Sequence, residues 1–201
     1  MSKVVWDAYN QNSESFFDLY ESLSFAKMHR SFLRFLPNGN GTCLDVGAGS
    51  GRDAAALAAR GYIVTAVEPS QKLLHLAKSH HHHPNITWVE DSLPKLKKLS
   101  SSSKRYDFIL LSAVWMHILP TERMEALINL KQLLKPKGFI AFTLRIGITD
   151  CNDRPMYPVS VKELISQAEG LGFITVYQSR KSYDSLKRNN VEWRKVVLMS
   201  S

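Results

Sequence analysis

Cysteine is scarce in this sequence. Its 201 residues include only Cys43 and Cys151, which lie far apart and have no second cysteine at the spacing of a metal site. This scarcity argues against a disulfide framework or a thiolate zinc centre, and it favours a reducing, cytoplasmic location. Long apolar runs are also missing: residues 1–17 lack the apolar core of a secretion signal, and no segment reaches the length of a membrane span. We therefore expect neither a secreted nor a membrane-embedded protein.

Acidic residues are outnumbered by basic ones. Lys and Arg total 26 against 18 Asp and Glu, which gives a formal net charge of +8. Such a charge attracts nucleic acid, acidic membranes or anionic small molecules. The basic residues gather in segments 95–105 and 180–195, without the regular interleaving of aromatic side chains that is typical of nucleic-acid surfaces. Solvated loops and an edge of the fold account for them better, so we favour a small-molecule partner over nucleic acid, with no membrane contact, in a monomer or homodimer.

The chain has the length of one domain with a filled interior. Two helical patterns, at residues 13–22 and 25–36, come first. We expect residues 1–40 to form a helical lid over an α/β core of residues 41–201, with the whole chain, 1–201, as a single domain.

Short apolar runs alternate with helical patterns beyond residue 41. This alternation predicts strand–helix–strand units around a mostly parallel sheet, covered by helices on both faces as a three-layer αβα sandwich. The polar segment 179–190 carries no helical pattern and is predicted to be a loop, which allows the final strand to run antiparallel to its neighbour. The seven expected strands are residues 42–46, 62–67, 86–89, 106–111, 139–144, 173–177 and 191–198.

A glycine-rich segment, LDVGAGSG at residues 44–51, stands where the first strand should turn into an alanine-rich helix. Gly47, Gly49 and Gly51 permit a tight turn and let the backbone approach a ligand closely. A dinucleotide fingerprint would place its third glycine at the position of Arg52. The segment therefore predicts a ligand cradle of a different kind.

Acidic residues mark the ends of the first three strands. Asp45 is unsuited to a pyrophosphate but suits the positively charged amino group of a methionine moiety. Glu68 ends the second strand at roughly the 20-residue offset at which an acid binds a ribose. Asp91 follows the third strand, where it either accepts a hydrogen bond from an adenine amino group or caps a helix. This pattern favours a positively charged adenosyl ligand.

These segments resemble the class I S-adenosylmethionine-dependent methyltransferases, in particular the small bacterial type that includes tellurite-resistance-like enzymes. The resemblance extends over residues 42–173 and rests on LDVGAGSGRDAAALAARGYIVTAVEPS, YDFILLSAVWMHI and LLKPKGFIAFTL. It implies a Rossmann-like sheet of order 3-2-1-4-5-7-6 with one antiparallel strand. It also implies S-adenosylmethionine as the cofactor, bound over the carboxyl ends of the strands, and S-adenosylhomocysteine as the product.

The resemblance further implies which residues bind the cofactor. The first turn would hold the methionine part, the end of the second strand the ribose, and the end of the third the adenine, while the sulfonium would lie near the end of the fourth. In that order the residues are Asp45, Gly47, Ala48, Gly49, Gly51 and Arg52; Glu68, Pro69 and Ser70; Asp91, Ser92 and Leu93; and Ser112 and Ala113.

The acceptor side carries fewer signals. A sulfonium is an activated methyl donor, so a base is useful only where the acceptor is protonated, and His117 is the candidate catalytic base. His117 equally fits a core position under the following helix, and Trp115 is either core or a wall that stacks on the acceptor. Arg145 and Arg154 are expected to bind an anionic acceptor, with Tyr157 in the same proline-marked connection.

The four histidines at residues 80–83 raise the question of a metal. Adjacent histidines cannot all face one ion, and no acidic residue stands at useful spacing in the sequence, so no metal is expected.

The expected reaction is methyl transfer to an oxygen or nitrogen of a small molecule. RNA or protein methylation and a non-catalytic S-adenosylmethionine-binding protein remain as alternatives. The segment 112–115 lacks the Asn/Asp-Pro-Pro-aromatic motif and the Pro-Cys pair of two DNA-methylating classes, which excludes both. The missing third glycine disfavours a nicotinamide-dependent oxidoreductase.

Overall fold

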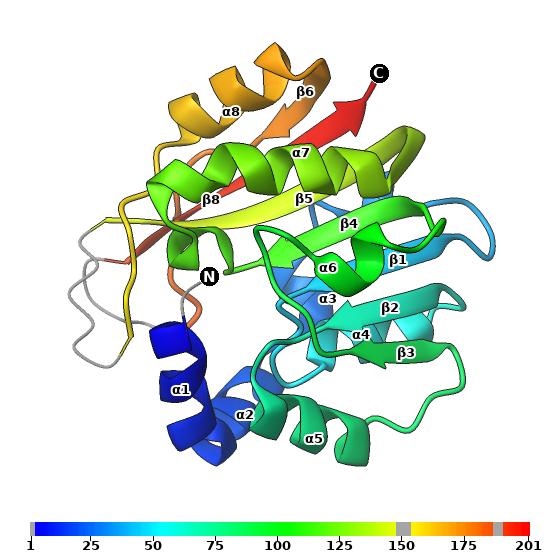
Figure 1. The fold of residues 1–201 in the computed structure, drawn as a ribbon, viewed down its shortest axis with the longest axis vertical. Coiled ribbons are helices and arrows are strands. Elements are labelled where there is room, and N and C mark those ends of the chain that lie inside the picture. The colour runs from blue at the N-terminus through cyan, green and yellow to red at the C-terminus, as the bar shows by residue number, and fades with distance from the viewer. Residues whose placement is uncertain (1–2, 148–153, 187–190) are drawn as a thin grey trace.

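A mixed β-sheet with helices on both faces forms the centre of the computed structural model, which describes residues 3–147, 154–186 and 191–201 (Figure 1). The strands lie in the order β3-β2-β1-β4-β5-β8-β6, and β8 runs antiparallel to both β5 and β6 while the other pairs are parallel. The strand β8 corresponds to the seventh predicted strand, so the predicted order 3-2-1-4-5-7-6 and its antiparallel strand are confirmed. The strand bounds are β1 Thr42–Val46, β2 Ile63–Val67, β3 Ile86–Val89, β4 Tyr106–Ser112, β5 Leu134–Ile146, β6 Phe173–Gln178 and β8 Glu192–Ser200.

One additional strand, β7 (Ser182–Tyr183), lies within the segment 179–190 that was predicted to be a loop. It pairs with Glu192 and Trp193 at the start of β8. The strand β6 pairs only with the later part of β8, from Val196 onward, so the start of β8 has backbone groups that β7 can pair with. The loop prediction was therefore wrong for these two residues.

Two layers of helices bury the two faces of the sheet. Along β4, Ile109 and Leu111 pack toward α6, α7 and α8, whereas Phe108 and Leu110 pack toward α3 and α4. This alternation follows from the two-residue period of a strand and gives the predicted three-layer sandwich. The helices are α1 Lys3–Gln11, α2 Ser13–Glu21, α3 Phe25–Met28, α4 Arg52–Ala58, α5 Gln71–His80, α6 Lys97–Ser100, α7 Arg123–Leu133 and α8 Val161–Gly170, with 3₁₀ turns η1 Leu33–Phe35, η2 Trp115–His117 and η3 Pro120–Glu122.

The N-terminal segment differs from the prediction in two ways. The helix α1 was not predicted, and the helix expected at residues 25–36 ends at Met28. His29 leaves the helical conformation, with φ −109° and ψ 17°, and its Nε2 lies 2.9 Å from Asp53 Oδ2. A buried contact with a distant residue thus ends this helix early, and only the 3₁₀ turn η1 follows. Both α1 and α2 pack against α5 (Figure 1).

Among the helices that the structure describes, none combines the length and the apolar character needed to cross a membrane. Cys43 is buried in β1 as a free thiol, and Cys151 lies outside the described residues.

Candidate active site

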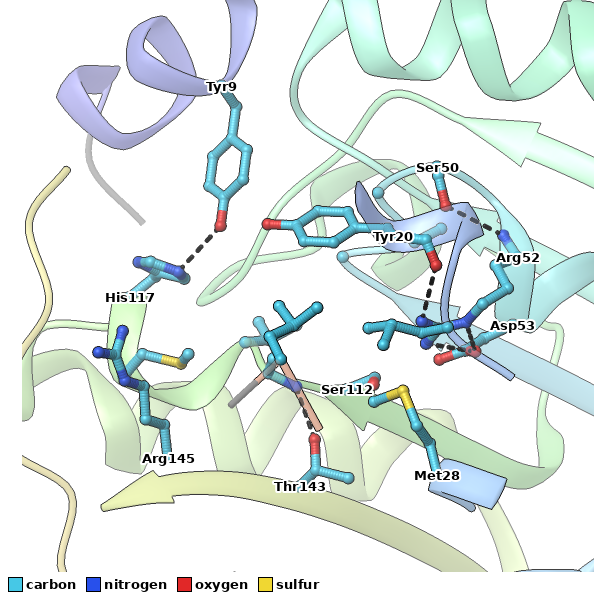
Figure 2. A pocket seen from close by; sticks show the side chains of 18 of the residues that line it. Tyr9, Tyr20, Met28, Ser50, Arg52, Asp53, Ser112, His117, Thr143 and Arg145 are labelled. Atoms are coloured by element: carbon cyan, nitrogen blue, oxygen red, sulfur yellow. Dashed lines mark hydrogen bonds and ion pairs between the residues drawn. The ribbon is translucent and has the colours of Figure 1, made fainter. Parts of the chain in front are cut away.

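A cavity of about 320 Å³ lies at the carboxyl ends of β1, β2, β4 and β5. The carboxyl ends of parallel strands meet at one edge of a sheet, which brings the residues after these strands together. The helices α1 and α2 cover the cavity with Trp6, Tyr9 and Tyr20. Figure 2 shows its two sides: Tyr9, His117 and Arg145 on one, and Ser50, Arg52 and Asp53 on the other.

The glycine-rich turn after β1 forms one wall. Gly47 has φ +71°, and a Cβ there would lie 2.6 Å from Val114 Cγ2, so both conformation and space require glycine. The backbone N–H groups of Gly47 and Ala48 both donate to the carbonyl of Val67, at 2.8 and 2.9 Å. These bonds fasten the turn to the end of β2.

Glu68, directly after β2, lies against this turn. Its Oε2 accepts from the N–H of Gly49 and its Oε1 from the N–H of Ser70, both at 2.8 Å. Burial raises the pKa of the Glu68 carboxyl to about 7, although these two hydrogen bonds oppose the rise. A carboxylate can accept about four hydrogen bonds. Glu68 lines the cavity and therefore keeps acceptor capacity for a ligand such as a ribose.

Asp45 lies beneath the turn, 1% exposed, and is not among the residues that line the cavity. Apart from a weak interaction with the backbone of Ala54, its carboxylate oxygens have no hydrogen-bond partner within the described part of the chain. Burial, and then the negative charge of Asp53, raise the pKa of the Asp45 carboxyl well above its usual range. Its predicted contact with a methionine amino group stays a prediction.

Asp53 joins the N-terminal segment to the turn through a buried charged network. Its Oδ1 accepts from Arg52 Nε at 2.7 Å, and its Oδ2 lies 2.9 Å from His29 Nε2. Burial raises the pKa of the Asp53 carboxyl, but His29 and Arg52 outweigh burial and hold it well below the usual range. Arg52 also donates to the carbonyl of Tyr20 in α2. The sequence analysis missed His29 and Asp53, because each stands next to an arginine and nothing local marks it as buried.

His117 lies on the opposite side of the cavity and is 3% exposed. Its Nδ1 lies 3.0 Å from the carbonyl oxygen of Pro155, which can only accept, so Nδ1 carries the proton. Burial raises the pKa of Tyr9, and its hydroxyl donates to His117 Nε2 at 3.2 Å (Figure 2). Burial, together with the charges of Arg154 and Arg145, lowers the pKa of His117 to about 4. The imidazole is thus neutral, with the unprotonated Nε2 toward the cavity.

Two arginines complete this side. Arg145 is 8% exposed, and its Nη1 lies 3.0 Å from Met156 Sδ. The guanidinium of Arg154 stands over the rings of Tyr9 and Phe16, at 5.0 and 4.6 Å from their centroids. Both arginines line the cavity and give this side positive charge.

Comparison with known proteins gives the family. Residues 43–138 match a family described as a methyltransferase domain. The malonyl-[acyl-carrier protein] O-methyltransferase of Halalkalibacterium halodurans is 27% identical over 127 residues, which cover 61% of this chain and 46% of that protein. The ubiquinone biosynthesis O-methyltransferase of Coxiella burnetii is 32% identical over 100 residues, or 50% of this chain and 42% of that protein. The chain therefore spans less than half the length of these curated relatives.

The solved structure of 1,6-didemethyltoxoflavin-N1-methyltransferase from Burkholderia thailandensis shares the fold, with a TM-score of 0.72 and 18% identity over 98% of this chain and 88% of that one. The family match and the sheet order agree. Residues 43–138 carry a methyltransferase domain, and the sheet has the class I S-adenosylmethionine-dependent methyltransferase fold.

The methyltransferase domain brings most of the predicted residues to one cavity. Tyr9, Tyr20, Met28, Asp53, Thr143 and Lys195 also line it but were missed from the sequence. Ala113, at φ +59°, donates its N–H to Thr143 Oγ1 at 2.8 Å, which holds the turn after β4. The predicted residues that line the cavity are Gly47, Ala48, Gly49, Arg52, Glu68, Pro69, Ser112, Ala113, His117, Arg145 and Arg154.

The other predicted residues of the methyltransferase domain lie behind or beside the cavity wall. Asp91 caps the start of α6, since its Oδ2 accepts from the N–H groups of Lys98 and Leu99, while its Oδ1 accepts from the N–H of Ser92. Trp115 is 1% exposed and packs edge-on against Phe142, which favours its core alternative. The predicted residues that do not line the cavity are Asp45, Gly51, Ser70, Asp91, Ser92, Leu93, Trp115 and Tyr157, and their ligand contacts stay predictions.

Proposed function

We propose that this chain transfers a methyl group from S-adenosylmethionine to an oxygen atom of a small, negatively charged acceptor. One observation carries the proposal: His117 is neutral, presents Nε2 to the cavity and lies beside Arg145 and Arg154. S-adenosylmethionine, when bound, supplies a methyl group on a positively charged sulfur. The protein then has to align the acceptor, remove its proton and exclude water.

The residues at the strand ends fit the cofactor. The turn from Gly47 to Gly49 presents backbone to the cavity, and Glu68 has lone pairs available for ribose hydroxyls. Ser112 and Ala113 would lie near the sulfonium, between this turn and His117. Pyrophosphate in this cavity would lie against the acid Glu68, which disfavours a dinucleotide.

The acceptor would occupy the side of His117. An acceptor hydroxyl in place of the Tyr9 hydroxyl would give its proton to Nε2 while its oxygen forms the new bond to carbon. Arg145 and Arg154 would hold an anionic group of the acceptor and favour loss of its proton. Both curated relatives described above are named O-methyltransferases, which supports oxygen as the methylated atom.

The cover over the cavity favours a small acceptor. Trp6, Tyr9 and Tyr20 close the cavity from α1 and α2, so a macromolecule would have to present a thin, extended group. RNA or protein acceptors, and a non-catalytic role, remain alternatives that turnover decides.

Calorimetry and a turnover panel test the function. We expect heat on titration with S-adenosylmethionine and S-adenosylhomocysteine, and none with NAD. In the presence of S-adenosylmethionine, S-adenosylhomocysteine should form faster with small carboxylic acids and phenols as acceptors than with matched amines or RNA. If the chain bound NAD but neither S-adenosylmethionine nor S-adenosylhomocysteine, the proposed cofactor would be refuted. Binding of S-adenosylmethionine without turnover on any acceptor would favour the non-catalytic alternative.

The variant Arg145→Met tests the negative charge of the acceptor. It should raise KM for an anionic acceptor about tenfold or more, because a charge-assisted hydrogen bond contributes about 1.5–3 kcal/mol. Affinity for S-adenosylhomocysteine should stay within about twofold of wild type. An uncharged amide analogue of the same acceptor is the control, since its KM should not respond. An unchanged KM for the anionic acceptor would contradict this role of Arg145.

A further inference from the structure

Glu21, His80 and His81 meet on the outer side of the glycine-rich turn. Glu21 ends α2, His80 ends α5, and His81 is the C-cap of α5. One possible ligand atom from each lies within 4.8 Å of the other two. His81 Nε2 is 3.1 Å from Glu21 Oε1, and the rings of His80 and His81 have centroids 4.8 Å apart.

The end of α5 explains how two adjacent histidines face one point. His80 is still helical, whereas His81 leaves the helix with φ −109° and ψ 81°, and the two rings stand at 83° to each other. His83 is engaged elsewhere, because its Nδ1 accepts from the N–H of Asn85. The sequence offered no nearby acid, but the packing of α2 on α5 brings Glu21 to these rings.

The three side chains form a donor set that suits a first-row divalent ion. Two imidazole nitrogens and one carboxylate oxygen are typical ligands of Zn²⁺, with water in the remaining position. His80 is exposed, so an ion can reach the cluster from solvent, while the side chains of His81 and Glu21 are only 14% and 24% exposed.

The cluster lies behind the glycine-rich turn, which forms one wall of the cofactor cavity. A Cβ at Gly51 would lie 2.9 Å from His81 Cδ2, so the His81 ring packs directly on the turn. The side chain of Ser50, in the same turn, forms a hydrogen bond with Glu21. Tyr20, next to Glu21, lines the cavity, and its carbonyl accepts from Arg52.

We propose that Glu21, His80 and His81 form a zinc site that fastens α2, part of the cover of the cofactor cavity, to α5 and the glycine-rich turn. An ion held by both helices stabilises the covered arrangement, so zinc strengthens cofactor binding. Because coupling between two binding sites is reciprocal, the cofactor product also strengthens zinc binding.

Zinc binding is measured first, by calorimetry with ZnCl₂ on the full chain, free of affinity tags and stripped of metal by a chelator. We expect one ion per chain. His80→Ala and Glu21→Gln should each weaken zinc binding roughly tenfold or more. His82→Ala, at an exposed neighbouring histidine, is the matched control and should stay within about twofold of wild type. Circular dichroism confirms that each variant is folded.

Two outcomes of this titration would overturn the site. If Glu21→Gln binds zinc as wild type does, the carboxylate is not a ligand. If His82→Ala loses as much affinity as His80→Ala, the ion sits on the exposed histidine run. Neither measurement needs an acceptor or methyl transfer, so failure of the proposed function would leave this test intact.

The coupling is measured second, by titration of S-adenosylhomocysteine with and without ZnCl₂. Zinc should raise the affinity of the wild-type chain roughly fivefold or more and leave that of His80→Ala unchanged. A wild-type affinity that does not respond to bound zinc would overturn the fastening of α2.

Discussion

Glu68→Gln should weaken the binding of S-adenosylhomocysteine about 100-fold. In the proposed complex the carboxylate accepts from ribose hydroxyls as well as from the N–H groups of Gly49 and Ser70, which it already binds. Hydrogen bonds to a charged group contribute about 1.5–3 kcal/mol each, and a loss of about 3 kcal/mol corresponds to roughly 100-fold in Kd. Calorimetry at pH 8 measures the change. Glu90→Gln, at an exposed acid just after β3, is the matched control.

The pH dependence gives a second readout of Glu68. Its pKa of about 7 lies above the ordinary value of 4.5, so protonation favours the folded, ligand-free state; this contribution to stability is complete below pH 4.5 and is lost as pH rises through about 7. Ribose hydroxyls need the ionised form. Wild-type affinity should therefore fall about tenfold per pH unit below pH 7, whereas that of Glu68→Gln stays nearly flat. A folded Glu68→Gln variant that binds within threefold of wild type would remove Glu68 from the pocket.

His117→Ala should lower kcat about 100- to 1000-fold, because a positioned general base contributes roughly 10²–10⁴ in rate. Affinity for S-adenosylhomocysteine should change less than about twofold, since His117 lies on the acceptor side. With a pKa of about 4, His117 is already unprotonated at neutral pH. Protonation of His117 should therefore lower the wild-type kcat only as the pH approaches 4. Release of S-adenosylhomocysteine on an active acceptor measures both effects.

Two further variants serve as controls for the His117→Ala measurement. His117→Asn can still donate to the carbonyl of Pro155 but lacks the basic nitrogen, so it should be as slow as His117→Ala while keeping the local fold. His75→Ala, at an exposed position of α5, should behave as wild type. Unchanged turnover in both His117 variants would show that the acceptor loses its proton without this residue.

The sheet was largely predictable because its signals are local. Apolar runs rich in Val, Ile and Leu mark strands that are buried on both faces, and the glycine-rich turn marks the end of β1. The sheet order came from the family resemblance, and the antiparallel ending from the missing helix before β8. The helix α1 was missed because Val4, Val5 and Trp6 are consecutive apolar residues that hide the helical period, and Val4 is in fact 62% exposed.

The site was predictable where one strand end supplies the residue, as at Glu68, and was missed where distant segments meet. His29 and Asp53 are 24 residues apart, and Tyr9 and His117 are 108 apart, so no local spacing indicates either pair. The same limit applies to the expectation of no metal, which considered only acids near the histidine run and not Glu21 on α2. For Asp91 the alternative, a helix cap, agrees with the hydrogen bonds that its carboxylate accepts from the N–H groups of Lys98 and Leu99 in α6.

Apart from His117, the residues expected on the acceptor side lie outside the family segment. The shared family segment, residues 43–138, holds the glycine-rich turn and Glu68. Tyr9 and Tyr20 precede that segment, and Arg145 and Arg154 follow it. The groups expected to select the acceptor can therefore vary while Glu68, the glycine-rich turn and His117 are retained: exchanging the connection after β5 between relatives would change acceptor preference and keep both the methyl-donor residues and the base.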